Sequence, residues 1–151
     1  MPKLDPKKND FPITLHDPCN LVRMMGIVKP QREILRNICP QFREMIPYGV
    51  NNHCCGGGGG FAVMSSMNFL SWRSTVAGRM KLKQILDVFG DVISPKVNKY
   101  VCAPCSNCKG QLRDIFDSYN VQQRSGITYG GLAELIVNAM VDLKDPWLKW
   151  E

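Results

Sequence analysis

Five of the seven cysteines fall into three groups whose spacing could hold a metal centre. Cys105 and Cys108 form a C-x-x-C pair, and this spacing lets two sulfurs reach one metal ion or cluster from a tight turn. Cys54 and Cys55 are adjacent, so in extended backbone their side chains point apart and rarely bind the same zinc ion. Adjacent cysteines can instead bind different irons of a larger cluster. Together with Cys19, the pattern therefore favours a polynuclear iron–sulfur centre.

Five consecutive glycines, Gly56 to Gly60, follow the paired cysteines. Glycine lets the backbone approach a bulky inorganic core, and its amide group can donate a hydrogen bond to sulfur. We therefore expect Gly56, Gly57 and Gly58 to take part in cofactor binding. A plain flexible loop is the alternative. A phosphate-binding loop is disfavoured because Phe61 comes next, where such a loop requires a Gly-Lys-Ser or Gly-Lys-Thr ending.

Two further cysteines and one histidine are weaker candidates. Cys39 lies at the end of an expected helix, where a buried structural thiol is the favoured interpretation. Cys102 forms a second C-x-x-C pair with Cys105. A structural zinc ion held by Cys102, Cys105, Cys108 and one other thiolate is therefore the alternative to a redox centre. His53, next to the paired cysteines, is either a donor of a hydrogen bond or proton near the site, a minor ligand, or a structural or exposed residue.

Length and composition define the broad class of protein. The chain has 151 residues, of which 44% are hydrophobic, and this is enough for one domain with its own core. No apolar run approaches the length of a membrane span, and residues 1–10 are polar, which argues against a signal peptide. We therefore expect a cytoplasmic location, where clustered cysteines bind metals or do redox chemistry more often than they form disulfides.

The net charge of +6 does not by itself indicate a nucleic-acid partner. The count treats every cysteine as neutral, whereas metal-bound cysteines are thiolates that each add a negative charge. The basic residues are also spread along the chain. We expect the densest group to be the solvated face of a helix: Arg73, Arg79, Lys81 and Lys83. We expect no nucleic-acid binding, although the charge is compatible with steering toward an acidic partner protein.

The hydrophobic pattern predicts short strands that alternate with helices. We expect residues 1–11 to be a linker or tail and residues 12–151 to be one domain. The expected strands lie at 13–16, 45–46 and 99–101. The expected helices lie at 29–39, 66–89, 112–119 and 128–143, with a loop at 91–97 and with Met80 filling the core.

This order of elements predicts an α/β fold with a small, mainly parallel sheet that is flanked by helices in Rossmann-like βα units. Ligands of such folds gather at the carboxyl ends of the strands. Because all three cysteine groups follow expected strands or loops, we expect the cysteines to converge at one edge of the sheet.

Three motifs match a known family. They are His16-Asp17-Pro18-Cys19, Cys54-Cys55-Gly56-Gly57, and Cys105-Ser106-Asn107-Cys108 with Leu112 four residues on. In these motifs the chain resembles the cysteine-rich CCG domain, which is found in the B-type subunit of heterodisulfide reductase and its relatives. The resemblance covers roughly residues 12–143, and its C…CCG…CxxC signature is specific.

The resemblance implies a noncubane [4Fe-4S] cluster that is held by the five motif cysteines: Cys19, Cys54, Cys55, Cys105 and Cys108. It also implies an oxidoreductase in which a disulfide-type substrate is cleaved at the cluster in one-electron steps. On this basis we expect Cys54 and Cys55 to be the catalytic pair.

Within the family, the runs 20–23, 56–60 and 105–112 are most similar to the K-type subunit of the DsrMKJOP membrane complex of sulfur metabolism. For that subunit the expected substrate is the persulfide, trisulfide or disulfide form of DsrC, a small sulfur carrier protein with C-terminal cysteines. The expected partners are therefore the other subunits of a membrane complex and a DsrC-like carrier. Such partners would bring the chain to the cytoplasmic face of a membrane.

Two features depart from the family pattern. The gap between Cys55 and Cys105 is longer than expected for the family, which predicts an insertion around residues 91–99. Full-length relatives also carry an upstream ferredoxin-like domain with cubane clusters, and the 151 residues contain no such segment. We therefore expect an excised domain that binds its centre without turnover on its own.

Overall fold

The computed structural model describes residues 3–59, 67 and 69–150, and its centre is a four-stranded sheet with all strands parallel. The strands lie in the order β2-β1-β3-β4. Their bounds are β1 Ile13–Leu15, β2 Phe42–Arg43, β3 Lys99–Cys102 and β4 Ile127–Gly130. The α/β fold with a parallel sheet is therefore confirmed.

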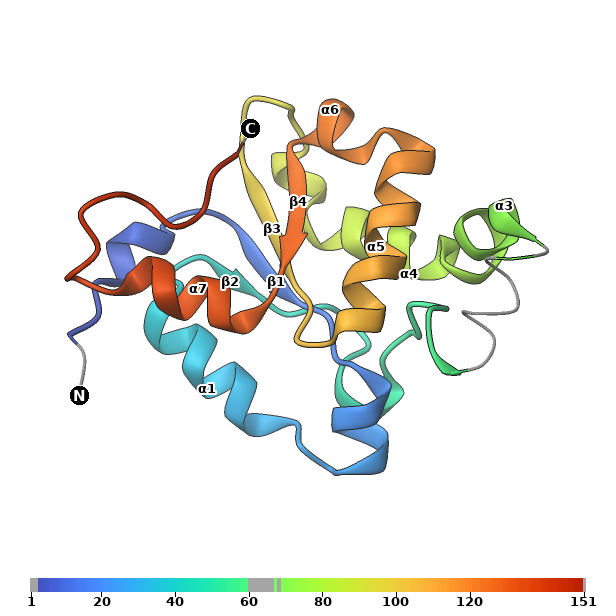
Figure 1. Ribbon diagram of the computed structural model, residues 1–151, viewed down its shortest axis with the longest axis horizontal. Helices are drawn as coiled ribbons and strands as arrows, with labels where there is room; N and C mark the ends of the chain where they lie inside the picture. The colour runs from blue at the N-terminus through green and yellow to red at the C-terminus, as the bar shows by residue number, and fades with distance from the viewer. Residues whose placement is uncertain (1–2, 60–66, 68, 151) are drawn as a thin grey trace.

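Helices surround the sheet (Figure 1). The α-helices are α1 Lys29–Ile38, α3 Leu70–Trp72, α4 Arg79–Val88, α5 Ser106–Tyr119, α6 Val121–Ser125 and α7 Leu132–Ala139. The short 3-10 and π turns are η1 Pro6–Asn9, η2 Asn20–Met24, η3 Gly49–Asn51, η4 Arg73–Ala77 and η5 Gly90–Val92. None of the described helices is long and apolar enough to cross a membrane.

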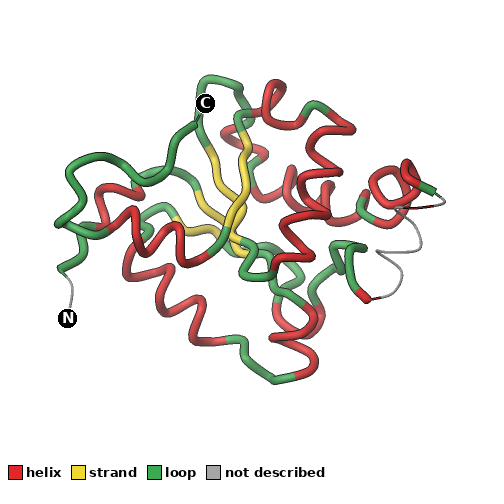
Figure 2. The backbone as a smooth tube through the Cα atoms, viewed as in Figure 1, coloured by secondary structure: helices red, strands yellow, loops and turns green. Residues whose placement is uncertain are grey.

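Both faces of the sheet are covered, as Figure 2 shows for the helices on either side of the strands. Successive side chains of a strand point to opposite faces. In β3, Tyr100 and Cys102 pack with α1 and α7, whereas Val101 and Ala103, directly after the strand, pack with α4 and α5. All four residues are buried, as is typical of a parallel strand between two helical layers.

The connections create a switch point between β1 and β3. The chain leaves β1 for β2 through α1, which packs on one face, and returns from β2 to β3 through α4, which packs on the other. The loops that follow β1 and β3 therefore diverge, although the two strands pair directly. Ligands of open parallel sheets bind at such a point, outside the carboxyl ends of the strands. The segments 16–19 and 103–108 begin there.

The strands expected at 13–16 and 99–101 and the helix expected at 29–39 are confirmed within one residue at their ends. The strand expected at 45–46 is wrong, because β2 lies at Phe42–Arg43. Met45 is fully buried, but it packs into the core shared with α4 and α5 as part of the loop after β2. Its apolar character therefore reflects burial and not strand pairing.

The helix expected at 128–143 is also wrong at its start. Residues Ile127–Gly130 form β4, and the helix α7 runs from Leu132 to Ala139. The β-branched and aromatic residues of 127–129 favour a strand, and β4 pairs with β3 along four residues. The helix expected at 112–119 begins earlier, at Ser106, so that Cys108 lies in its first turn.

The long helix expected at 66–89 is broken into α3, η4 and α4, and residues 66 and 68 lie outside the described residues. The break allows close packing, because a Cβ atom on Gly78 would lie 2.4 Å from Cδ1 of Ile115 in α5. It also changes which side chains face inward. Met80, expected in the core, is 50% exposed, whereas Ile85 and Phe89 are fully buried.

The segment before β1, which we expected to be a linker or tail, packs against α1 and α7 through η1, and its Lys3 accepts a hydrogen bond from the backbone amide of Val141, beyond α7. Asn9 is fully buried, and its side-chain amide donates hydrogen bonds to the carbonyl oxygens of Ile38 (3.1 Å) and Leu135 (2.9 Å). Its carbonyl oxygen accepts a hydrogen bond from Asn138 at 2.9 Å. One side chain thus joins the N-terminal segment to both helices on this face of the sheet.

We expect Asn9→Ala to lower the free energy of unfolding by about 1–3 kcal/mol, because it leaves buried carbonyl and amide groups without partners. Urea unfolding followed by circular dichroism measures the change. Lys7→Ala is the control, because Lys7 is exposed in the same short helix. Equal midpoints for the two variants would show that the N-terminal segment contributes nothing through Asn9.

Candidate metal centre

Two of the cysteine groups meet at the switch point. The Sγ atoms of Cys55 and Cys108 lie 3.4 Å apart, although the residues are 53 positions apart in the chain. Both side chains are buried, and both cysteines are free thiols. Cys108 is delivered by the first turn of α5, which follows β3, and Cys55 by the loop that follows η3.

A histidine that the sequence analysis did not single out completes this group. One ring nitrogen of His16 and the sulfurs of Cys55 and Cys108 all lie within 4.8 Å of one another. His16 is only 1% exposed, and neither ring nitrogen has a hydrogen-bond partner within the described part of the chain. Burial, and then the positive charge of Lys81, holds the pKa of His16 well below its usual value. The imidazole is therefore neutral, which is the form that binds metals.

The strand period could have identified His16. The register pairs Thr14 with Val101, and Val101 belongs to the core on the α4 and α5 side. His16 follows Thr14 by two residues and therefore continues that face. His53, the histidine that we considered from the sequence, is partly exposed and lines the same cavity.

The remaining predicted ligands lie around this pair of sulfurs. Cys19 and Cys54 are both exposed, and with His16 and Cys55 they line one small cavity. Cys105 is partly buried and precedes the first residue of α5, so that it lies one helical turn before Cys108. The structure therefore brings Cys19, Cys54, Cys55 and Cys108 to one site, and Cys105 begins the helix that carries Cys108.

The other two cysteines lie away from this site. Cys39 and Cys102 are buried in the core between the sheet and the helices α1 and α7, on the opposite face from Cys108. Burial raises the pKa of Cys39 to about 12 and that of Cys102 well above its usual value. This geometry supports the structural interpretation of Cys39. It argues against zinc held by Cys102 together with Cys108.

Two of the glycines give the paired cysteines their shape. The backbone amides of Gly56 and Gly57 donate hydrogen bonds to the sulfurs of Cys54 (3.3 Å) and Cys55 (3.4 Å). Gly56 has a φ of 82°, in the left-handed region that favours glycine. A Cβ atom on Gly57 would lie 2.6 Å from Cβ of Gln111 in α5, whereas one on Gly58 would meet no atom of the described residues within 4 Å. Close packing therefore requires glycine at position 57 and not at position 58.

Protonation of the thiols opposes metal binding. Hydrogen bonding with Cys108, together with burial, raises the pKa of Cys55 to about 12. Hydrogen bonding with Cys55, and then burial, raises the pKa of Cys54, while the Gly56 amide and Arg23 act in the opposite direction. Thiolates are the ligating form, so metal binding must release these protons, and metal affinity must fall as the pH falls.

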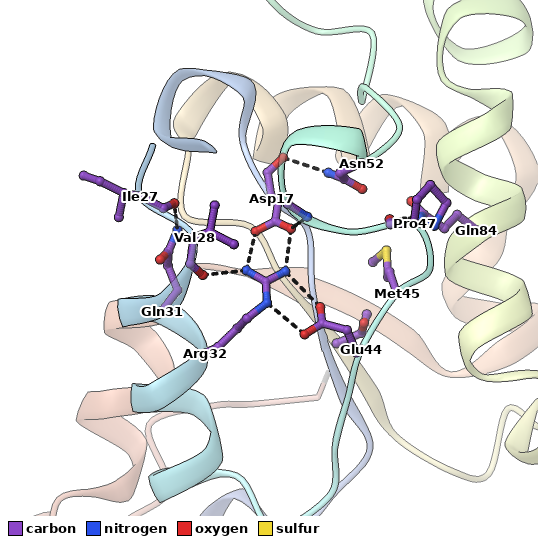
Figure 3. Close-up of polar contacts among 12 residues, drawn as sticks. Asp17, Ile27, Val28, Gln31, Arg32, Glu44, Met45, Pro47, Asn52 and Gln84 are labelled. Atoms are coloured by element: carbon purple, nitrogen blue, oxygen red, sulfur yellow. Dashed lines mark hydrogen bonds and ion pairs between the residues drawn. The ribbon is translucent and has the colours of Figure 1, made fainter. Parts of the chain in front are cut away.

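A buried ion pair holds the segment that carries His16 and Cys19 (Figure 3). Both carboxylate oxygens of Asp17 accept hydrogen bonds from Arg32 in α1, at 2.9 and 2.5 Å. Asp17 also accepts a hydrogen bond from the backbone amide of Gly49 at 2.6 Å, and its carbonyl oxygen accepts one from the side chain of Asn52 at 2.8 Å. Arg32 in turn binds Glu44 through both carboxylate oxygens, at 2.8 and 2.9 Å.

The expected position of Lys81 was wrong. We assigned it to a solvated helix face, but its side chain is fully buried in α4. The signal lay in the helical spacing, because Lys81 precedes the buried Ile85 by four residues. The neighbouring Lys83 is exposed, as expected.

The donor set fits an iron–sulfur group. Cysteine sulfur is the ligand that iron–sulfur clusters take, and backbone amides that donate to sulfur are typical of their sites. The unpartnered nitrogens of His16 are a separate sign, because a buried polar group normally has a partner. Five residues would hold the group: Cys19, Cys54, Cys55, Cys105 and Cys108. His16 would lie beside it.

Comparison with known families and proteins gives a consistent result. A family model described as a cysteine-rich domain, CCG, matches residues 13–113. An Hdr-like menaquinol oxidoreductase iron-sulfur subunit of Archaeoglobus profundus is 30% identical over 141 residues, which are 91% of this chain and 23% of that protein. The D-type subunit of the dihydromethanophenazine:CoB--CoM heterodisulfide reductase is 34% identical over 113 residues in Methanosarcina acetivorans, which are 74% of this chain and 24% of that protein.

The corresponding protein of Methanosarcina barkeri is 31% identical over 129 residues, which are 85% of this chain and 27% of that protein. The chain thus spans about a quarter of the length of these relatives. No solved structure matches the chain.

We expect Arg32→Met to lower the free energy of unfolding by about 3–5 kcal/mol, because it leaves the Asp17 carboxylate buried without its partner. Urea unfolding measures the loss, and the double variant with Asp17→Asn should recover part of it. Arg36→Met is the matched control, since Arg36 is exposed one turn later in α1. Additive losses in the double variant would mean that the pair is not coupled.

We expect Gly57→Ala to reduce the metal content of the purified protein, because the added Cβ atom pushes the Cys54-Cys55 loop away from α5. Gly58→Ala should leave the metal content unchanged, because its Cβ atom meets open space. Elemental analysis of the two variants, prepared side by side without oxygen, makes the comparison. Equal metal contents would show that this packing does not control the site.

Proposed function

Because this chain belongs to the cysteine-rich CCG domain family, we propose that it is an iron–sulfur redox domain of a heterodisulfide-reductase-like subunit. In this proposal a noncubane [4Fe-4S] cluster is held by Cys19, Cys54, Cys55, Cys105 and Cys108. The observation that carries it is the approach of the Cys55 and Cys108 sulfurs to 3.4 Å beside a buried histidine whose ring nitrogens have no hydrogen-bond partner among the described residues. When bound, such a cluster supplies one-electron transfer.

The reaction that we propose is the reduction or formation of disulfide-type bonds. Reduction breaks one S–S bond and consumes two electrons and two protons: R–S–S–R′ + 2 e⁻ + 2 H⁺ → R–SH + R′–SH. A trisulfide takes four electrons and four protons and releases H₂S in addition to the two thiols. The electrons come one at a time from an iron–sulfur donor of the ferredoxin type in a partner subunit. The names of the relatives, which include heterodisulfide reductase, support this class of reaction.

The different burial of the cysteines supports two roles, in which buried cysteines anchor the centre and exposed ones face the substrate. Cys55 and Cys108 are buried and anchor the centre in the core. Cys19 and Cys54 are exposed, so a substrate sulfur can approach from their side. Arg23 steadies that side, because its guanidinium donates hydrogen bonds to the carbonyl oxygens of Val50 (2.9 Å) and Asn52 (2.8 Å). We propose Cys54, on the exposed side, together with its buried neighbour Cys55 as the catalytic pair.

The substrate and partners form the finer part of the proposal. We propose a small sulfur carrier protein of the DsrC type, with cysteines near its C-terminus, as the substrate. Large apolar side chains are exposed in the two segments next to Arg23, at Met24, Met25, Ile46 and Val50, which supports contact with a protein. We further propose subunits of a membrane complex as partners and a position at its cytoplasmic face, because metal-binding cysteine clusters are typical of reducing compartments.

The first test is the metal and sulfide content of protein that is purified and reconstituted without oxygen. We expect about four irons and four acid-labile sulfides per chain, with an EPR signal of the reduced or oxidised cluster. Cys55→Ala should lose most of both, because it removes a buried ligand. Cys39→Ala is the matched control, since its thiol is buried on the other face of the sheet.

One outcome would replace the proposal. The set of His16, Cys55 and Cys108 also suits zinc, which binds histidine and cysteine in tetrahedral sites. One zinc ion and no sulfide, unaffected by changing Cys19, would identify a structural metal module.

If the cluster is present, the substrate is tested by adding a ferredoxin-type reductant and a carrier-protein disulfide. Thiol release that Cys54→Ala abolishes supports catalysis at this site, whereas a reducible cluster without thiol release indicates an electron relay.

A further inference from the structure

Among the residues that the structure describes, Lys81 is a buried cation with no carboxylate partner. Its side chain is fully buried, and its ammonium donates hydrogen bonds to Oδ1 of Asn52 (2.7 Å) and Oε1 of Gln84 (2.5 Å). The third contact is weak, to the sulfur of Met45 at 3.9 Å. None of these partners is charged, and among the described residues no ion pair involves Lys81.

A buried charge of this kind needs a counter-ion. Taking an ammonium group out of water costs several kcal/mol unless an opposite charge lies nearby. The carboxylate that acts on Lys81 is Asp17, and Asp17 is already paired with Arg32 through both oxygens. The described side chains therefore leave the charge of Lys81 largely uncompensated.

The cysteine site lies close to Lys81, so a negatively charged group bound there would act as its counter-ion. Asn52, which accepts the hydrogen bond from Lys81, lines the cavity together with Cys54 and Cys55. As thiolates, the sulfurs of Cys55, Cys54 and Cys108 each favour the charged form of Lys81. Burial is the larger effect and lowers the pKa of Lys81 to about 8, which still leaves the ammonium protonated at neutral pH.

We propose that Lys81 is the internal counter-charge of the metal centre and that its ammonium offsets the charge of the bound thiolates and raises the reduction potential. The inference deepens the proposed function and rests on it. Reduction adds one negative charge to the centre, and a fixed positive charge in a medium of low dielectric constant stabilises the more negative state. Lys81 does not contact the reacting atoms, so it is a positioning residue that acts through its field.

A purely structural role predicts a different pattern of effects. Lys81 and Gln84 also connect α4 to the segment after β2, because Gln84 donates a hydrogen bond to the carbonyl oxygen of Pro47 at 2.7 Å. Gln84→Met removes these hydrogen bonds and keeps the charge. Lys83→Met removes one charge from the same helix, but from an exposed ion pair with Asp87. Gln84→Met therefore tests the effect of the hydrogen bonds, and Lys83→Met tests the effect of losing an exposed charge.

The experiment compares wild type, Lys81→Met, Gln84→Met and Lys83→Met after reconstitution without oxygen. Iron and sulfide are counted, and the reduction potential is read from an EPR-monitored redox titration. Circular dichroism and thermal unfolding of each variant before loading record whether it folds. We expect a more negative potential, or a folded protein that fails to load the centre, for Lys81→Met alone. Gln84→Met and Lys83→Met should keep the wild-type potential.

Three results would overturn the inference: an unchanged potential in Lys81→Met, an equal shift in Gln84→Met, or Lys81→Met that is unfolded before loading. If Lys81→Met is unfolded before loading, Lys81 is needed for folding and not for the charge of the centre. If the wild type holds zinc and no sulfide, the proposed function fails, and the counter-charge is then tested by zinc affinity. Lys81→Met should weaken zinc binding about 10- to 100-fold, with the two controls unchanged. A wild type that binds neither metal would overturn both proposals.

Discussion

The buried ion pair between Arg32 and Asp17 joins the three segments on which the candidate site depends. Arg32 belongs to α1, Asp17 to the segment after β1, and Glu44 to the segment after β2. The same carboxylate accepts a hydrogen bond from Gly49, which begins the turn before the paired cysteines. The hydrogen bond from the Asn52 side chain to the carbonyl oxygen of Asp17 also joins the segment after β1 to the segment after β2 (Figure 3). The ion pair thus acts on the cysteines indirectly, through the backbone that carries them.

The two buried cations near the site, Arg32 and Lys81, differ in how their charge is balanced. Arg32 is matched by two carboxylates, whereas the hydrogen-bond partners of Lys81 in the described part of the chain are uncharged. The site has thiols with raised pKa values and a neutral histidine, so the protein alone supplies little negative charge there. Such an arrangement is costly in a core without a further group, and it becomes favourable when a metal converts the thiols to thiolates. The electrostatics and the cysteine pattern therefore point to the same kind of ligand.

Packing explains why the helical region before β3 is irregular. Gly56 and Gly57 lie against η4 and α5, and Gly78 lies against Ile115 of α5. A continuous helix with larger side chains would not allow α5 to approach so closely. The turn η4 also exchanges hydrogen bonds with α5, because Arg73 and Gln111 each donate to the other. Short π turns are frequently found at functional sites, and η4 lies next to the candidate site.

The sequence by itself determined which side chains can bind metal and the class of fold. The cysteine spacing, the CCG motif and the alternation of short apolar runs with helical patterns are local properties, so they can be recognised along the chain. Asn9, His16 and Lys81 were not recognised, because their roles come from partners that are distant in the sequence. The same holds for β2, since a strand of two residues is defined by the strand beside it and not by its own pattern, whereas the β-branched and aromatic residues of β4 did favour a strand.

Only the tertiary structure decided which cysteines share a site. Cys102 and Cys105 have the same C-x-x-C spacing as Cys105 and Cys108, yet the strand period places Cys102 on the opposite face of the sheet from Cys108. Spacing describes how far apart two sulfurs can be, whereas the sheet separates them into different layers. The approach of Cys55 to Cys108 across 53 residues likewise depends on the fold, which brings the loop after η3, beyond β2, against the first turn of α5, beyond β3.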